Sequence, residues 1–234
     1  MTVAEQHTRA APPPFLLRSD KRDRAYAPSY DWGSDSLGHR HDRIVDGVWS
    51  IPGWSAPEDC RKLYELAYFA EGPILEIGTY CGRSAVVMAM ALRDAGRDHP
   101  IVSVDIDPAA AALGHRNARA HEVEERIVFV CSTAARFLAT VPEFEPALVF
   151  VDGDHSAPGV LADLDTIAPH VRPGTLVFFH DYMPDELPNT DGFPVSPHPI
   201  EVAEAVESSW VPEHADFAGT FGWSALYRVH TRPV

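Results

Sequence analysis

Cysteine is scarce in this sequence and follows no recognisable spacing. Cys60, Cys81 and Cys131 form no CxxC pair and no cluster with histidine. Disulfide scaffolds and structural zinc sites need such patterns, so neither is indicated. Cys81 and Cys131 are instead expected to be small apolar packing residues.

Basic residues and long apolar runs are also lacking. Lysine and arginine number 19 against 34 aspartates and glutamates, which gives a formal net charge of −15. Nucleic acids and anionic membranes attract cationic surfaces, so neither is expected as a partner. No apolar run approaches the roughly 18 residues of a membrane span, and the polar, proline-rich N-terminus does not resemble a signal peptide. We therefore expect a soluble cytoplasmic protein.

Length and composition suit one α/β domain. The chain has 234 residues, which is enough for a sizeable core. Residues 1–50 show little aliphatic periodicity, so we expect a partly flexible extension that contacts the substrate or a second subunit of a homo-oligomer. The domain itself is expected over residues 51–234 and opens with a helix that Ser55 caps.

Apolar segments alternate with helical patterns from residue 74 onward. The strands read as continuous apolar runs, which is typical of a parallel sheet covered by helices on both faces. The last two segments, between Phe217 and Val229, predict a closing antiparallel hairpin. The expected fold class is α/β: a Rossmann-like, doubly wound, seven-stranded sheet. Strands are expected at 74–77, 101–105, 127–131, 147–151 and 175–179, and helices at 82–95, 108–121, 133–140, 157–168 and 200–210.

The sequence also lacks the G-x-G-x-x-G fingerprint of dinucleotide-binding proteins. Residues 75–84 read LEIGTYCGRS, so Tyr80 stands where that fingerprint has its middle glycine. A strand, a glycine turn and a helix in this order still present backbone N–H groups to a nucleotide-like ligand. Glu76 has no partner in a dinucleotide. It suits a ligand that carries a cation, such as the amino group or sulfonium of S-adenosylmethionine (SAM).

The next two strand ends supply further candidates for ligand contacts. Asp105 ends the second strand, where a carboxylate can accept hydrogen bonds from ribose hydroxyls. NAD and SAM both offer those hydroxyls, so Asp105 does not discriminate between them. Ser132 follows the third strand, where it would either contact adenine or cap the helix at 133–140.

A group of carboxylates and imidazoles follows the fourth and fifth strands. Residues 151–156 read VDGDHS and residues 179–182 read FHDY. The carboxyl ends of neighbouring parallel strands meet at one edge of a sheet, so the two groups are expected to lie close together. A turn with a helix cap is the structural alternative for either group alone. Together they predict a divalent-cation site or a proton-transfer site, whose members are Asp152, Asp154, His155, His180 and Asp181.

The run LEIGTYCGRSAV at residues 75–86 closely resembles the first motif of class I SAM-dependent O-methyltransferases of the catechol type. It also resembles bacterial enzymes that methylate natural products and their sugars, and the resemblance extends over about residues 55–230. It implies SAM as the cofactor and a hydroxylated small metabolite as the acceptor. The implied cofactor contacts are Glu76, Gly78, Tyr80 and Ser84 at the methionine end, with Thr79, Gly82 and Asp152 nearby, Asp105 on the ribose and Ser132 near the adenine.

The same resemblance implies a metal site. Asp152 and Asp181 match metal-binding carboxylates, and His180 or Tyr182 stands where the family has Asp or Asn. Histidine is a poor ligand for Mg²⁺ but suits Mn²⁺, Fe²⁺ or Zn²⁺, so the identity of the cation, and its use, stay open at this point. His155 stands where catechol-type enzymes place a catalytic lysine and is the expected general base; His180 is the rival base without a metal.

Two further segments complete the expectations. The proline-rich segment 183–199, with Phe193, is expected to cover the acceptor as a lid. Arg83 is expected to be a solvent-exposed side chain that lies over its helix rather than a substrate contact. The functions that compete with O-methyl transfer are a hydroxylase-like enzyme on the same scaffold, a metal-independent methyltransferase with a histidine base, an NAD-dependent oxidoreductase and a non-catalytic binding protein.

Overall fold

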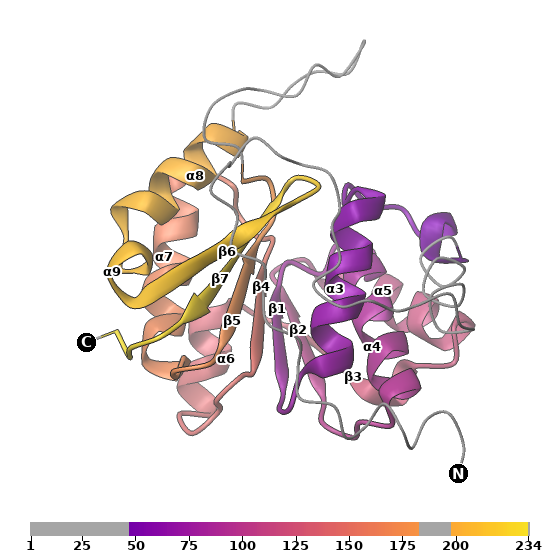
Figure 1. The fold of residues 1–234 in the computed structure, drawn as a ribbon. Coiled ribbons are helices and arrows are strands. Elements are labelled where there is room, and N and C mark those ends of the chain that lie inside the picture. Colours follow the sequence, from indigo (N-terminus) through magenta and orange to yellow (C-terminus); the bar gives the residue numbers. More distant parts are fainter. Residues whose placement is uncertain (1–46, 183–197, 234) are drawn as a thin grey trace, which may run out of the picture.

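The computed structural model describes residues 47–182 and 198–233, so most of the expected extension and residues 183–197 of the expected lid lie outside the described part. Seven strands form one sheet in the order β3-β2-β1-β4-β5-β7-β6 (Figure 1). Strands β1 to β5 pair in parallel, whereas β7 is antiparallel to both β5 and β6. The Rossmann-like class and the closing hairpin are confirmed. The strands are β1 (Ile74–Ile77), β2 (Ile101–Asp105), β3 (Ile127–Cys131), β4 (Leu148–Val151), β5 (Leu176–Phe179), β6 (Ala215–Phe221) and β7 (Ser224–Val229).

Helices cover both faces of this sheet (Figure 1). One face carries α3 (Pro57–Phe69), α4 (Arg83–Ala95) and α5 (Pro108–Ala120). The other carries α6 (Ala134–Thr140), α7 (Ala157–Ile167) and α8 (His198–Ser208), so residues 198 and 199 of the expected lid belong to a helix. Short elements complete the chain: α9 (Val211–His214) and the 3₁₀ turns η1 (Val48–Ser50), η2 (Glu124–Arg126) and η3 (Ala168–His170). None of the helices in the described ranges is both long and apolar enough to cross a bilayer.

The core explains the continuous apolar runs of the strands. Successive strand residues point to opposite faces of a sheet. Ile74, Ile101 and Phe150 pack toward α3, α4 and α5, whereas Leu75 and Val149 pack toward α6, α7 and α8. All five side chains are fully buried. Both faces of the sheet are therefore apolar, and no polar alternation appears in the sequence.

Two of the expected N-cap positions are displaced by one residue. Ala56, not Ser55, precedes α3, and Asp59 in the first turn accepts a hydrogen bond from the Ala56 N–H at 2.7 Å. Thr133, not Ser132, caps α6 with its side-chain oxygen. A side chain that reaches back from the first turn satisfies the helix start as well as a cap residue does. Ser132 is consequently left without the capping role.

The hairpin brings the end of the chain back to α3. Gly222, in the turn between β6 and β7, has a φ of +60°, and a Cβ there would lie 2.6 Å from Asp59 Oδ1. Glycine meets both requirements because it tolerates a positive φ and leaves room for the carboxylate. The turn therefore docks on Asp59, and the Trp223 N–H donates to its Oδ1 across 164 positions of sequence.

The cysteines follow their expected roles only in part. All three are free thiols. Cys60 and Cys81 are buried, but Cys131, at the end of the edge strand β3, is exposed. The packing role expected for Cys131 is wrong because an edge strand leaves its last side chain uncovered.

Candidate active site

The turn after β1 lies directly against the turn after β4. Gly78 and Gly82 have φ values of +98° and +79°, and Tyr80 between them has a φ of +45°. A Cβ on Gly78 would lie 2.0 Å from the carbonyl oxygen of Asp152, so a larger residue does not fit without moving one of the turns. The glycine turn and the first member of the polar cluster therefore form one continuous site.

Asp105 holds the glycine turn in shape. Its Oδ2 accepts hydrogen bonds from the backbone N–H groups of Thr79 and Tyr80, each at 2.9 Å. Its Oδ1 accepts one from the Asp107 N–H at 2.9 Å. A carboxylate has about four lone-pair positions, so Oδ1 keeps one for a ligand hydroxyl. Asp105 lines the cavity described below, and its contact with a ribose stays a prediction.

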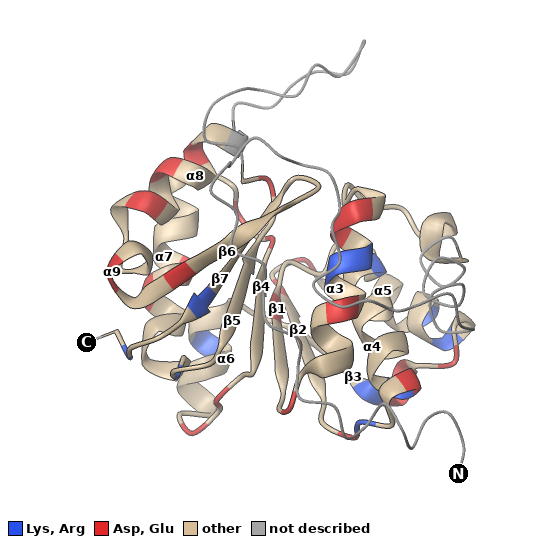
Figure 2. Ribbon diagram, viewed as in Figure 1, with Lys and Arg blue, Asp and Glu red and all other residues tan. Residues whose placement is uncertain are grey.

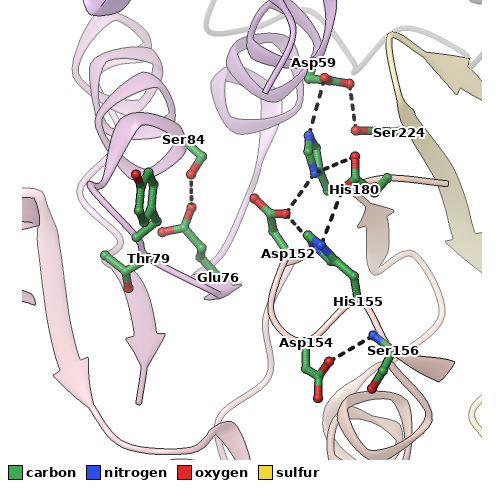
Figure 3. Close-up of polar contacts among 12 residues, drawn as sticks. Asp59, Glu76, Thr79, Ser84, Asp152, Asp154, His155, Ser156, His180 and Ser224 are labelled. Carbon is green, nitrogen blue, oxygen red and sulfur yellow. Dashed lines mark hydrogen bonds and ion pairs between the residues drawn. The ribbon is translucent and has the colours of Figure 1, made fainter. Parts of the chain in front are cut away.

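Glu76 lies beneath the glycine turn and is fully buried. The Ser84 and Ser103 hydroxyls donate to its two carboxylate oxygens (Figure 3 shows the Ser84 bond), and Thr79 Oγ1 lies 2.7 Å from Ser103 Oγ. Burial raises the pKa of Glu76 to about 8, although both serine hydroxyls oppose the shift. Glu76 is absent from the residues that line the cavity, so its contact with a ligand would run through Ser84, which does line it.

A cavity of 1220 Å³ opens at the carboxyl ends of the strands, between the glycine turn and the ends of β4 and β5. This is the crevice in which open α/β sheets bind ligands. Gly82 does not line it but stands at the start of α4 as the N-cap residue. The other expected site residues that line the cavity are Gly78, Thr79, Tyr80, Ser84, Asp105, Ser132, Asp152, Asp154, His155, His180 and Asp181.

The polar cluster consists of Asp152, His155, His180 and Asp181, and it gathers at the ends of β4 and β5 as expected. Figure 3 labels Asp152, His155 and His180. Asp152 Oδ1 lies 3.1 Å from His155 Nε2 and 2.9 Å from His180 Nδ1. The Asp181 carboxylate lies 3.4 Å from His155 Nδ1 and 3.5 Å from His180 Nδ1. Two carboxylates and two imidazoles thus share one small volume.

The opposite charges in this cluster stabilise the ionised forms of its members. Burial would raise the pKa of Asp152, but the charge of His180 and the hydrogen bond from His155 outweigh it and lower that pKa to about 2. Burial would lower the pKa of His180, yet Asp152 holds it well above 6.5. The pKa of His155 is also raised, because its hydrogen bond to Asp152 outweighs desolvation. Without a bound ion, the imidazoles are the counter-charges of the carboxylates.

The donor set fits a divalent cation with nitrogen ligands. One donor atom from each of Asp152, His155 and His180 lies within 4.8 Å of the others. Tyr182, one of the two candidates for the third ligand, is buried and donates its hydroxyl to Glu207 Oε1 at 2.5 Å, so it turns away from the cluster. Imidazole ligands suit Mn²⁺, Fe²⁺ or Zn²⁺ better than Mg²⁺.

Two residues play other parts than the expected ones. Asp154, placed in the cluster by sequence, accepts a hydrogen bond from the Ser156 N–H at 2.9 Å and helps to start α7 (Figure 3). Arg83 was expected to be exposed to solvent. Instead it donates to the Ile51 carbonyl at 2.7 Å and lies over the Trp49 ring. Arg83 therefore fastens the segment before α3 to the start of α4, beside the cavity.

Asp59 is the site residue that sequence reasoning missed. Its carboxylate is fully buried, and its Oδ2 lies 3.6 Å from His180 Nε2. Nothing in the local pattern marks Asp59, since it reads as an ordinary acid in the first turn of a helix. Only its position in the fold connects it with the cluster.

Comparison with known proteins finds methyltransferases that resemble this chain. A family model described as a methyltransferase domain matches residues 75–182, which hold both the glycine turn and the polar cluster. The rhamnosyl O-methyltransferase of Mycobacterium tuberculosis H37Rv is 28% identical over 215 residues, which cover 82% of this chain and 83% of that protein. These two matches support a class I SAM-dependent methyltransferase, as the motif at residues 75–86 predicts. The rhamnosyl O-methyltransferase of Mycobacterium leprae is 25% identical over 194 residues, 74% of this chain and 79% of the other, and these relatives support O-methylation as the reaction.

Solved structures share the fold of this methyltransferase. PaMTH1 of Podospora anserina, solved with S-adenosylhomocysteine, has a TM-score of 0.60 at 20% identity and covers 84% of this chain and 89% of its own. The O-methyltransferase TomG of Streptomyces achromogenes, solved with SAM, has a TM-score of 0.57 at 20% identity, with 84% and 91% covered. CalS11, a TDP-rhamnose 3′-O-methyltransferase, has a TM-score of 0.55 at 19% identity, with 84% and 96% covered.

Proposed function

We propose that this methyltransferase transfers the methyl group of SAM to a hydroxyl of a small, uncharged metabolite, with a divalent cation in the cluster of Asp152, His155, His180 and Asp181. A rhamnose-type sugar is the acceptor class that the names of its relatives suggest. The observation that carries the proposal is that this cluster and the glycine turn line the same cavity.

The chemistry requires the acceptor oxygen to lose its proton and to be held in line with the donor methyl. A bound divalent cation supplies both, because it lowers the pKa of a coordinated hydroxyl and fixes its position. Asp152 and His180 would hold the cation, with either Asp181 or His155 as the third ligand. Where Asp181 completes the set, His155, whose side chain is 26% exposed at the cavity, is placed to accept the acceptor's proton.

The charges around the cavity favour an uncharged acceptor. Arg83 is the one arginine or lysine among the described lining residues, and backbone carbonyls already bind its guanidinium. The sequence of residues 183–197 contains no lysine or arginine. Among the described lining residues and residues 183–197, a phosphorylated acceptor would meet carboxylates and no free counter-charge, whereas a neutral hydroxyl would meet no such repulsion. The acidic excess extends over α8 and α9 (Figure 2), and the lining carboxylates are Asp105, Asp107, Asp152, Asp154, Asp163 and Asp181.

Methylation of matched acceptors tests the proposal. The protein is incubated with SAM and either a neutral aryl rhamnoside or TDP-rhamnose, in Mn²⁺ or in EDTA, and products are followed by mass spectrometry. We expect methylation of the rhamnoside in Mn²⁺ and a loss of at least about 100-fold in Asp152→Ala, because an interaction with the reacting group is lost. S-adenosylhomocysteine should still raise the melting temperature of that variant, since its cofactor turn is intact.

Asp163→Asn is the matched control, because Asp163 lines the cavity outside the cluster. It should keep its turnover. Full activity of both Asp152→Ala and Asp181→Ala would refute the assignment of the cluster, and a preference for TDP-rhamnose would refute the uncharged acceptor.

A metal-independent methyltransferase with a histidine base is the second candidate. The contacts of Asp152 Oδ1 with His155 Nε2 at 3.1 Å and His180 Nδ1 at 2.9 Å favour it, because they balance the buried charges without an ion. In that case EDTA would leave turnover unchanged, whereas His155→Ala would abolish it.

A further inference from the structure

His180 lies between carboxylates on both sides of its ring. Its Nδ1 is 2.9 Å from Asp152 Oδ1, and its Nε2 is 3.6 Å from Asp59 Oδ2 (Figure 3). The His180 side chain is only 1% exposed. Within the described part of the chain, neither ring nitrogen makes a hydrogen bond of good geometry. The orientation of this ring therefore depends on its ion pairs with Asp59 on the Nε2 side and with Asp152 and Asp181 on the Nδ1 side.

Asp59 is fixed more firmly than the ring that it faces. Its Oδ1 accepts hydrogen bonds from the Trp223 N–H at 3.0 Å and from Ser224 Oγ at 2.7 Å. Its Oδ2 accepts one from the Ala56 N–H at 2.7 Å. These donors come from the start of α3 and from the hairpin, so two separate parts of the fold set the position of one carboxylate. A carboxylate held in this way can impose an orientation on a neighbour.

The two carboxylate oxygens of Asp59 have different partners. Oδ1 binds the hairpin, and Oδ2 faces both the helix start and His180. Removing the Ser224 hydroxyl would disturb the hairpin contact alone. Removing the whole Asp59 side chain would also release His180. The chain thus offers a matched pair of substitutions that separates a structural role from a role at the site.

We propose that Asp59 is the positioning residue of the active site: its Oδ2 attracts the Nε2–H of His180 across 3.6 Å and so directs Nδ1 of that ring at Asp152 and the cavity. Asp59 touches neither the cavity nor a ligand there, so it acts through His180. It is the outer carboxylate of a carboxylate–histidine pair, the arrangement that fixes the tautomer and the ring orientation of metal-binding histidines. The importance of His180 rests on the proposed function, whereas the orientation itself does not.

The first test determines which nitrogen of the His180 ring carries a proton in the metal-free protein. Long-range ¹H–¹⁵N NMR of the ¹⁵N-labelled, EDTA-treated wild type shows which imidazole nitrogen carries a proton, and His180→Gln assigns the signal. The spectra are recorded on the alkaline side of the His180 titration, where the neutral ring keeps a single proton, and we expect that proton on Nε2. In Asp59→Ala the His180 signals should move, while in Ser224→Ala they should stay in place. A wild-type Nε2 without a proton overturns the proposal, and that result needs no variant to fold.

The second test measures the consequence for a ligand of the ring. Mn²⁺ binding is titrated calorimetrically in the presence of S-adenosylhomocysteine. We expect Asp59→Ala to weaken Mn²⁺ binding about 10- to 100-fold, as loss of an outer-shell partner does. Asp59→Asn, which retains an acceptor oxygen, should restore part of the affinity, and Ser224→Ala should lie within about twofold of the wild type.

The outcomes separate the two proposals. If the wild type binds no Mn²⁺, the metal in the proposed function fails, and the NMR spectrum alone decides on Asp59. If Mn²⁺ binds and Asp59→Ala and Ser224→Ala lose the same affinity, Asp59 has only a structural role and the inference is refuted.

Discussion

Replacing Glu76 by glutamine should remove a pH-dependent penalty on folding. Glu76 is fully buried, and burial raises its pKa from an ordinary 4.5 to about 8. The folded protein therefore holds a proton here that the unfolded chain has already released. Between these two pH values, stability falls as the pH rises, because the folded state binds more protons than the unfolded state.

The size of the effect follows from the shift. Each pH unit inside the window costs about 1.4 kcal/mol, so this one group should lower the free energy of unfolding by about 3 kcal/mol between pH 5 and pH 7. For a chain of 234 residues that corresponds to roughly 6–12 °C in melting temperature. Glu76→Gln keeps the shape of the side chain and an acceptor for one serine hydroxyl, but it does not ionise.

Urea unfolding of wild type and Glu76→Gln at pH 5, 6, 7 and 8 measures the difference. Other groups titrate in both proteins, so only the difference in free energy of unfolding reports Glu76. The free energy of unfolding of Glu76→Gln should rise relative to that of the wild type as the pH increases, until about pH 8. Glu213→Gln, on an exposed position of α9, is the matched control and should show no such trend. A difference that stays constant from pH 5 to pH 8 would show that Glu76 is not perturbed in this way.

Three further substitutions probe the turn, the base and the rim of the cavity. Gly78→Ala should abolish the thermal shift by S-adenosylhomocysteine and lower the melting temperature, because its Cβ would lie 2.0 Å from the Asp152 carbonyl oxygen; a normal shift would contradict this geometry. His155→Ala should lower turnover at neutral pH and recover part of it at high pH, where the acceptor ionises unaided; an unchanged pH–rate profile would remove His155 as the base. Arg83→Ala should raise the KM for the acceptor more than it lowers kcat, because the segment that carries Trp54 loses the hydrogen bonds that its Ile51 and Ser55 carbonyls accept from Arg83; equal KM values would show that this segment does not bind the acceptor.

The order of elements and the place of the site could be predicted because they depend on local patterns. Continuous apolar runs identify strands that are buried on both faces, and the boundaries at 74–77, 101–105 and 127–131 agree with the structure residue for residue. Parallel strands present their carboxyl ends at one edge, so Asp152 and His180 had to lie near each other once the fold class was fixed. The same reasoning placed Asp105 at the end of the second strand on this edge, but it did not predict that the carboxylate accepts two backbone N–H groups of the glycine turn.

Which atoms meet within that edge was decided by the tertiary structure alone. Asp59 faces His180 because the hairpin residues Trp223 and Ser224, more than 160 positions away, fix its carboxylate. Tyr182 turns to Glu207 instead of the cluster, although it directly follows Asp181 in sequence. A short-range pattern encodes the direction of a backbone and the burial of a face, whereas a hydrogen bond between distant elements depends on distances of a few ångströms that only the packed chain sets.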